Sequence, residues 1–288
     1  MSCALTLLIP TTKAPPGAWS VADAVRTQVD AVNAEILVAT GNAIADPIPD
    51  APVRVLHLPG ADVFELRAAG LAEARGEVIV MLEDHNYPTD DFCARILGAF
   101  DAHPEADGVV GSATNGALGL LDRASFLVTW GPFLAPMPEI SLHRCPPPGI
   151  VAFRRSVVPN GVPPSGWLEY EMVVGLLNKG SLVADDRVQM NHIQHLGLRA
   201  LPIHFHSGRA FGGLTHEPRS SLSRAQRLRE AARVPSLLMR QAREGLQRGN
   251  IRESFACRVA IGALATSNAI GQMVGVLFGP GKSASHLE

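Results

Sequence analysis

The sequence has few cysteines for its 288 residues, and the four present are widely spaced. Cys3, Cys93, Cys145 and Cys257 form no CxxC pair, so we expect neither a disulfide framework nor a cysteine zinc site. Unpaired thiols of this kind are typical of a reducing compartment. The apolar stretch 2–9 is too short for a cleavable signal sequence and has no basic start. The expected location is therefore the cytoplasm.

A strong net charge is also missing, because the formal charge is only −2. This balance hides an asymmetry: residues 219–258 hold ten arginines and three glutamates, which gives +7 there and −9 elsewhere. Such segregation predicts a basic C-terminal surface that faces anionic lipid, phosphate or an acidic partner. Aromatic residues hardly interleave with these arginines, since only Phe255 and Phe278 follow Phe211. Binding of nucleic acid is therefore not expected.

Apolar residues are plentiful, at 47% of the chain, and they suffice for a full core. In the N-terminal part, short apolar runs alternate with helical patterns. The expected strands are 4–10, 34–40, 53–59, 77–82 and 106–114, and the expected helices are 19–32, 63–74 and 91–100. This alternation predicts an α/β fold with a mostly parallel central sheet. Such sheets bind their ligands beyond the carboxyl ends of the strands.

Three ionisable side chains, Glu83, Asp84 and His85, follow the fourth expected strand directly. Carboxylates that converge at a strand end suit Mg²⁺ or Mn²⁺, which commonly bind one or two of them together with substrate phosphates. The simpler interpretation is a solvated loop in which Asp84 caps a turn through its side chain. The position at a strand end is compatible with both.

Six segments together form a more specific pattern than any one of them alone. They are LTLLIPT, EILVATGN, LRAAGLAEARGEVIVMLEDH, PPPGIVAFRRSVV, GWLEYEMVVGLLNKGSLV and DRVQMNHIQH. In this order and spacing, they resemble the GT-A glycosyltransferases of the large inverting family that includes cellulose and hyaluronan synthases. Two further stretches, 131–136 (GPFLAP) and 208–213 (GRAFGG), resemble a bacterial subgroup. The Gln-x-x-Arg-Trp motif of processive synthases is absent, so the resemblance is to non-processive members.

The resemblance implies a GT-A domain that transfers a hexose from a UDP- or GDP-sugar, with inversion and with Mn²⁺ or Mg²⁺ as cofactor. The donor-binding residues that it implies are Pro10, Thr11, Thr12, Thr40, Arg67, Gly70, Glu83, Asp84 and Arg209. The metal ligands that it implies are Asp84, His85 and His192. The general base that it implies is Glu169, with Glu171 as the fallback.

The chain departs from the family pattern at two places. Ala39-Thr40-Gly41 stands where the family has an aspartate after its second strand. In the metal motif, Glu83 replaces the usual first aspartate and His85 takes the third position. These departures leave open which nucleotide sugar is the donor and whether the enzyme depends on a metal ion.

Several of the implied residues have a simpler interpretation as well. His195 takes the place of His192 if the alignment shifts by one turn. Arg67 is either a bidentate ligand of the pyrophosphate or a solvated helix arginine. Arg209 lies either in a glycine-rich loop that approaches phosphate or in a flexible connection to the C-terminal helices.

The acidic helix that carries the two candidate bases has alternatives of the same kind. Glu169 and Glu171 are either catalytic or simply first-turn acids favoured by the helix dipole. Trp167 either stacks on a sugar or packs in the core.

The chain after residue 217 differs from the part before it, so we predict a GT-A domain over 1–217 and a helical region over 218–281. Two arginine-rich helices are expected at 221–234 and 236–248, separated by Pro235. The stretch 255–278 is long and apolar. The polar residues that interrupt this stretch and would be costly in lipid are Arg258, Asn268 and Gln272.

These helices predict a region that lies on a membrane, with arginines toward anionic head groups. The alternatives are a helical appendage that covers the sheet or forms a homodimer, and a transmembrane span. A peripheral position at the inner face of the cytoplasmic membrane suits a lipid-linked or envelope glycan acceptor, as the resemblance also implies.

Two other functions compete with glycosyl transfer. The first is a catalytically inactive GT-A-like module that binds sugar nucleotides or membranes, which the missing aspartate near Thr40 favours. The second is a nucleotidyltransferase, but the segment after the first strand, IPTTKAPPG, has Lys13 without the glycine pattern typical of that class.

Overall fold

The computed structural model describes residues 3–12, 17–42, 53–137, 150–159, 168–214 and 221–287. It divides into two compact units. Unit 1 comprises Met1–Thr114 and Met137–His192, and unit 2 comprises Asn115–Pro136 and Ile193–Glu288. The division at residue 217 that composition suggests stays a prediction.

Unit 1 is built on an eight-stranded sheet of order β3-β2-β1-β4-β7-β6-β8-β5. The strands are β1 Leu5–Thr11, β2 Ala34–Thr40, β3 Val53–His57, β4 Val78–Met81, β5 Asn86–Pro88, β6 Gly108–Asn115, β7 Val151–Arg154 and β8 Leu182–His192. Strands β3, β2, β1 and β4 run parallel, whereas β7 is antiparallel to both β4 and β6, and β5 is antiparallel to β8. The predicted α/β class is confirmed.

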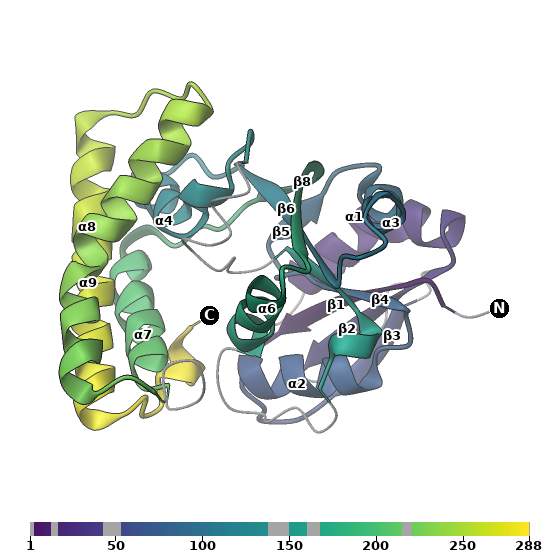
Figure 1. Ribbon diagram of the computed structural model, residues 1–288, viewed down its shortest axis with the longest axis horizontal. Coiled ribbons are helices and arrows are strands. Elements are labelled where there is room, and N and C mark those ends of the chain that lie inside the picture. The colour runs from purple at the N-terminus through teal and green to yellow at the C-terminus, as the bar shows by residue number, and fades with distance from the viewer. Residues whose placement is uncertain are drawn as a thin grey trace. The chain divides into compact units, whose positions relative to one another are not determined.

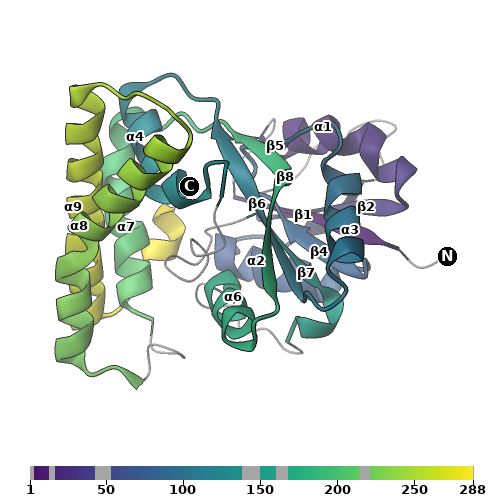
Figure 2. The same cartoon turned by 45° about the horizontal axis from the view of Figure 1, so that its top comes forward.

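Helices cover both faces of this sheet (Figures 1 and 2). They are α1 Gly17–Ala31, α2 Val63–Glu73, α3 Phe92–Ala102 and α6 Leu168–Lys179, with a 3-10 turn η2 at Arg155–Val157. Helices α1 and α3 lie on one face, and α2 lies on the other (Figures 1 and 2). Because both faces are covered, β1 is buried along its whole length and reads as a continuous apolar run.

Helix α2 lies close to strand β1 because Gly70 has no side chain. A Cβ atom at Gly70 would meet Leu8 Cδ1 at 2.3 Å, and Leu8 is itself fully buried. The helix begins with a capping box in which Asp62 accepts from the Glu65 amide and Glu65 accepts from the Asp62 amide. The position of α2 on the sheet is therefore set by a small residue and a strong start signal.

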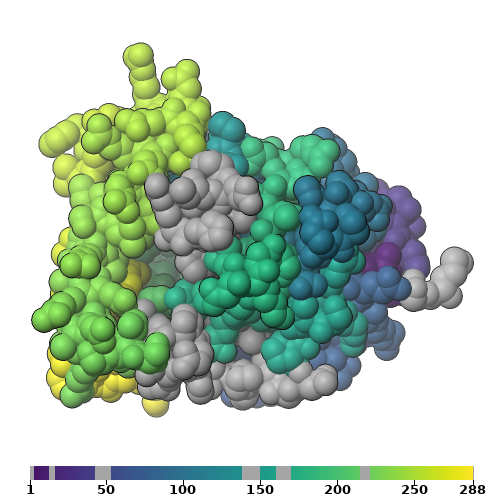
Figure 3. Space-filling model, viewed as in Figure 1, coloured from purple at the N-terminus to yellow at the C-terminus, as the bar shows by residue number. Residues whose placement is uncertain are grey.

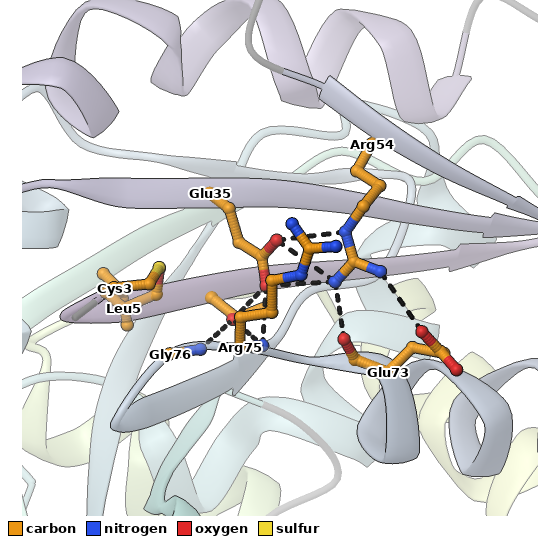
Figure 4. A network of polar contacts seen from close by, with 8 residues as sticks. Cys3, Leu5, Glu35, Arg54, Glu73, Arg75 and Gly76 are labelled. Atoms are coloured by element: carbon orange, nitrogen blue, oxygen red, sulfur yellow. Dashed lines mark hydrogen bonds and ion pairs between the residues drawn. The ribbon is translucent and has the colours of Figure 1, made fainter. Parts of the chain in front are cut away.

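A charged network joins the amino ends of the parallel strands (Figure 4). The Glu35 carboxylate of β2 accepts from Thr6 Oγ1 of β1 at 2.8 Å and from the Arg75 amide at 2.7 Å. Arg54 of β3 pairs with Glu35 at 3.1 Å and also reaches Glu73 at the end of α2. One carboxylate thus holds three strands and the α2–β4 connection together.

Unit 2 is helical. Its elements are α4 Leu120–Trp130, η1 Gly131–Phe133, η3 Gly197–Arg199, α7 Ala200–Gly212, α8 Arg224–Arg248, α9 Phe255–Phe278 and η5 Ser283–His286. Helix α9 packs against α7, α8 and α4. By length and composition, this helix could cross a membrane. However, 44% of its apolar stretch is buried inside the structure, and buried core helices can have the same length and composition.

Glycines allow α7 and α9 to approach each other with their backbones in contact. A Cβ atom at Gly208 of α7 would lie 2.0 Å from the Asn268 carbonyl oxygen of α9. A Cβ atom at Gly271 of α9 would lie 2.0 Å from the Phe205 carbonyl oxygen of α7. The missing side chains of these glycines therefore set the short distance between α7 and α9.

Two local expectations for unit 2 are wrong. Pro235 does not break the arginine-rich region into two helices, because α8 runs without interruption from Arg224 to Arg248. Proline removes only one amide donor, and packing of α8 along α9 stabilises the turns on either side. The segment around Arg209 is not a loop either, since it forms the last turn of α7.

Candidate functional site

The carboxyl end of β4 leads directly into a tight acidic turn. Glu83, Asp84 and His85 follow the strand, and the turn closes with a hydrogen bond from the Asn86 amide to the Glu83 carbonyl at 3.0 Å. Asn86 starts β5 and pairs in register with His192, the last residue of β8. Two strand ends that are far apart in sequence therefore bring their polar side chains to one place.

Asp84 is held in a fixed position inside this turn. Only 4% of the residue is exposed, and its Oδ2 accepts from Thr11 Oγ1 at 2.7 Å. Its other oxygen, Oδ1, accepts from His85 Nδ1 at 2.8 Å. The structure thus brings Thr11, at the end of β1, to the acidic turn.

His85 lies between two carboxylates. Its Nδ1 contacts Asp84, and its Nε2 lies 3.2 Å from Glu83 Oε2. Burial opposes protonation of the ring, but the hydrogen bonds and charges of the two carboxylates outweigh burial and raise the pKa of His85 to about 9. In the free protein the ring is therefore an imidazolium that bridges two acids.

Glu83 is kept ionised by the same neighbours. Burial favours the neutral acid, but the hydrogen bond and the charge of His85 outweigh it, so that the pKa of Glu83 is lowered to about 2. Arg67 of α2 acts in the same direction, with its guanidinium 3.6 Å from Glu83 Oε1. Arg67 is only 9% exposed, so it is not the solvated helix arginine of the simpler interpretation.

Glu83, His85 and His192 have the geometry of a possible metal site. Each offers one ligand atom, and these atoms lie within 4.8 Å of one another. A carboxylate oxygen with two imidazole nitrogens suits Mn²⁺ or a related divalent ion. The residues therefore fit the implied cofactor, with Glu83 in the set, while Asp84 is engaged by Thr11 and His85.

The structure brings His192 to the acidic turn, and the choice between His192 and His195 as metal ligand stays a prediction. His192 is 5% exposed and its ring lies 4.7 Å from the ring of His85. His195 belongs to unit 2, and 71% of its side chain is exposed.

Asn86 joins the two halves of this site, and its role was missed from the sequence. Its Oδ1 lies 2.7 Å from His192 Nδ1, and its Nδ2 donates to Glu83 Oε2 at 3.4 Å. The residue is fully buried. Its place directly after the acidic motif was the only available signal.

Asn42, a second residue missed from the sequence, joins the ends of β1 and β2. Its side-chain Nδ2 donates to the Thr12 carbonyl, and its amide donates to Thr40 Oγ1 at 3.1 Å. In the parallel register, Pro10 of β1 lies opposite Ala39 of β2. The predicted donor residues at the ends of β1 and β2 are thus adjacent. The sequence signal for Asn42 was its position as a polar residue just after a buried strand.

The candidate bases lie on α6. Residue 169 belongs to this helix, but its side chain, like all of Trp167, lies outside the described residues. Glu171 is half-buried and borders a cavity of about 320 Å³. The other residues that line this cavity are Val157, Pro159, Met172, Gly175, Leu176 and Lys179.

Two other predicted donor residues have structural contacts. Gly70 permits the close contact of α2 with Leu8. Arg209 donates from Nε to the Gly279 carbonyl at 3.2 Å, within unit 2. Both assignments to the donor stay predictions.

The solved structures that this chain resembles include a mannosyltransferase. The mannosyltransferase PcManGT from Pyrobaculum calidifontis, solved in complex with GDP-Man and Mn²⁺, is 16% identical with a TM-score of 0.55, and the match covers 95% of this chain and 87% of that one. TarS 1-349 from S. aureus is 10% identical with a TM-score of 0.44, over 94% and 90% of the two chains. S. aureus TarS is 11% identical with a TM-score of 0.47, over 85% and 49%.

The sequence comparisons give the family. No curated protein matches the chain. Residues 7–156, more than half of the chain, match the model of the family described as glycosyl transferase family 2, and the PcManGT likeness agrees with the GT-A fold. The chain therefore belongs to glycosyl transferase family 2 and is a glycosyltransferase.

Proposed function

We propose that this glycosyltransferase moves a hexose from a nucleoside diphosphate sugar to an acceptor hydroxyl, with inversion and with a divalent metal ion. The observation that carries the proposal is the convergence of Glu83, His85 and His192 beside the buried Asp84. In this interpretation, the enzyme is a non-processive member of the family that includes cellulose and hyaluronan synthases.

Negative charge builds on the leaving diphosphate as the glycosidic bond breaks. A bound Mn²⁺ or Mg²⁺ would neutralise that charge, and Glu83, His85 and His192 are the residues that would hold it. To serve as a ligand, His85 would have to lose a ring proton and one of its two carboxylate contacts. Asp84 and Thr11 keep the turn in place, and Arg67 adds a fixed positive charge beside Glu83.

Inversion requires a base on the side of the sugar opposite the leaving group. Glu169 or Glu171 would accept the proton of the attacking hydroxyl as general base. The cavity that Glu171 borders is a reason to test Glu171 beside Glu169.

The donor base would lie near the ends of β1 and β2. Pro10, Thr11, Thr12 and Thr40 are the residues we propose for that contact, and Asn42 holds two of them. PcManGT was solved with GDP-Man and Mn²⁺, so GDP-mannose is the first donor to test, ahead of UDP-sugars.

We propose a lipid-linked or envelope glycan as the acceptor, in bacterial polysaccharide or glycolipid biosynthesis. The enzyme would lie in the cytoplasm at the inner face of the cytoplasmic membrane, as a monomer or homodimer and without nucleic acid. The support is the excess of arginine in residues 219–258.

The test is calorimetric titration with GDP, UDP and their sugar conjugates, with and without Mn²⁺ or Mg²⁺. We expect metal-dependent binding of one nucleotide to the wild type and its loss in Glu83→Gln and Asp84→Ala. Asp90→Asn, which changes an exposed acid near the same turn, is the matched control. Binding without turnover of any sugar conjugate would favour the inactive binding module, which the threonine at position 40 already favours. No binding by a folded wild type would contradict both.

A further inference from the structure

An apolar strip runs along the solvent side of α9. Phe255, Val259, Ile270 and Leu277 are between 40% and 80% exposed. At 100° per residue, these four positions lie within about 60° of one another around the helix. Thr266, exposed on the same side, donates its hydroxyl to the Gly262 carbonyl at 2.8 Å, so its polar group is satisfied within the helix.

A basic strip runs along the solvent side of α8. Arg229, Arg233, Arg240 and Arg243 are exposed and lie within about 80° around the helix. Arg240 pairs only loosely with Glu244, at 3.9 Å. The other three guanidinium groups form no ion pair within the part of the chain that the structure describes.

The two strips border one seam between α8 and α9, which pack against each other and overlap in both ribbon views (Figures 1 and 2). Met239 of α8 is 45% exposed, and its sulfur lies 3.8 Å from the place of a Cβ atom at Gly262. In angular position around the helix axis, Met239 lies next to the basic strip of α8, and Gly262 lies next to the apolar strip of α9. Helix α8 covers much of unit 2 on the side shown in Figure 3.

We propose that this seam, with its apolar and basic strips, is the surface through which unit 2 binds an anionic lipid bilayer. Apolar side chains would enter the head-group region while the arginines meet lipid phosphates. A second copy of the chain fits less well, because a two-fold contact through this face would bring arginine strips of the same sign together. The inference specifies the membrane location proposed above.

The test is flotation of the full-length protein with phosphatidylcholine vesicles and with vesicles that also contain phosphatidylglycerol. We expect binding to the anionic vesicles only, weakened by salt. The variant Arg229→Glu/Arg233→Glu should reduce it about tenfold or more. Phe255→Ser/Ile270→Ser should reduce it as well, whereas Leu198→Ser, at a residue that is 79% exposed outside the seam, should not.

The result is independent of catalysis, because vesicle binding needs neither donor nor metal. Failure of the folded wild type to float with anionic vesicles would overturn the inference. So would a dimer by light scattering that Phe255→Ser/Ile270→Ser converts to a monomer. Loss of nucleotide binding alone would count against the proposed reaction and leave the membrane surface standing.

A different observation carries a second inference, about Asn86. A carboxylate only accepts hydrogen bonds, so the amide NH₂ of Asn86 must face Glu83 and its Oδ1 must face His192. An amide oxygen also only accepts, so His192 carries a proton on Nδ1. When the ring is neutral, Nε2 is then the nitrogen that carries the lone pair and can act as a ligand atom.

We infer that Asn86 is a positioning residue that fixes the His192 tautomer through the orientation that Glu83 imposes. This inference rests on the proposed metal site, but its first test does not. Long-range ¹⁵N–¹H correlation spectra of histidine-labelled protein report the tautomer directly, with His192→Gln for assignment. We expect the Nδ1–H form in the wild type and in Asn86→Asp, which keeps an acceptor, and its loss in Asn86→Ala.

Metal affinity gives the second measurement. Titration of Mn²⁺ by electron paramagnetic resonance should show binding about 10- to 100-fold weaker in Asn86→Ala. Asn191→Ala, at the neighbouring residue of β8, is the control and should bind as the wild type does. An Nε2–H tautomer in the wild type would overturn the inference even if no Mn²⁺ binds at all, and an unchanged affinity in Asn86→Ala would overturn it if Mn²⁺ does bind.

Discussion

Two charged clusters lie at opposite ends of the same parallel strands in unit 1. At the amino ends, Glu35 is held by the Thr6 hydroxyl, the Arg75 amide and Arg54. At the carboxyl ends, the Glu83 carboxylate meets the side chains of His85, Arg67 and Asn86 among the residues that the structure describes. The Glu35 cluster holds strands together, and one of its hydrogen bonds comes from the backbone. In the Glu83 cluster, a bound ligand could take the place of a side-chain partner.

The clusters also differ in what they could bind. Ligand atoms of Glu83, His85 and His192 converge within 4.8 Å, and the pKa values of Glu83 and His85 are strongly displaced by their mutual contact. Displaced pKa values and convergent ligand atoms are typical of functional sites. Charged residues at the ends of strands therefore indicate a functional site only when their contacts are known.

The largest effect should come from breaking the carboxyl-end cluster. In Asp84→Ala, we expect donor affinity and turnover to fall about 100-fold or more, because the turn that carries the metal ligands loses its anchor on Thr11. Calorimetry with donor and Mn²⁺ gives the affinity, and thermal unfolding gives the stability. Stability loss without loss of donor affinity would place Asp84 with Glu35 as a structural residue.

The carboxyl-end cluster should make the stability of the protein depend on pH. Because the pKa of His85 rises from 6.5 to about 9 on folding, its contribution is fully present below pH 6.5 and is lost as pH rises through 9. The unliganded wild type should lose up to about 3 kcal/mol of unfolding free energy over this range. Denaturant unfolding of wild type and His85→Gln checks this. Equal pH slopes for the two proteins would contradict it.

Breaking the amino-end cluster should affect stability alone. We expect Glu35→Gln to lower the unfolding free energy by about 2 kcal/mol, because Arg54 loses one of its two carboxylate partners. Denaturant unfolding measures this change, and the donor affinity should stay that of the wild type. A donor affinity lowered as much as in Asp84→Ala would remove the distinction between the two clusters.

A substitution at Gly70 tests how closely α2 must pack against β1. We expect Gly70→Ala to cost about 1–2 kcal/mol, because the new methyl group meets the buried Leu8 at 2.3 Å. Gly98→Ala in α3 is the control, since no atom lies within 4 Å of its new Cβ and alanine is the better helix former. If Gly70→Ala lost donor affinity without a change in stability, Gly70 would be a donor-binding residue and not only a packing residue.

Much of unit 1 could be predicted because its signals are local. Buried parallel strands such as β1 and β2 are mostly apolar runs, and the acidic turn follows β4 directly. The antiparallel strands β5 and β7 were not foreseen, because each is short and pairs with a distant partner. For the same reason the sequence could not place Asn86 opposite His192 or Asn42 beside Thr12.

In unit 2, tertiary packing overrode the local rules. Pro235 is a breaker by itself, yet α8 continues through it along α9. Gly208 and Gly212 suggested a loop around Arg209, whereas they are the residues that let α7 touch α9. A glycine chosen for close approach and a glycine chosen for a turn look alike in one sequence.

The measurement that tests the central claim most directly is the titration of Mn²⁺ by electron paramagnetic resonance, in the presence of GDP. We predict that the wild type and Glu35→Gln bind the ion, and that Glu83→Gln and His192→Gln do not. Equal binding by all four proteins, or none by the folded wild type, would contradict the assignment of a metal-assisted donor site to the carboxyl ends of the strands.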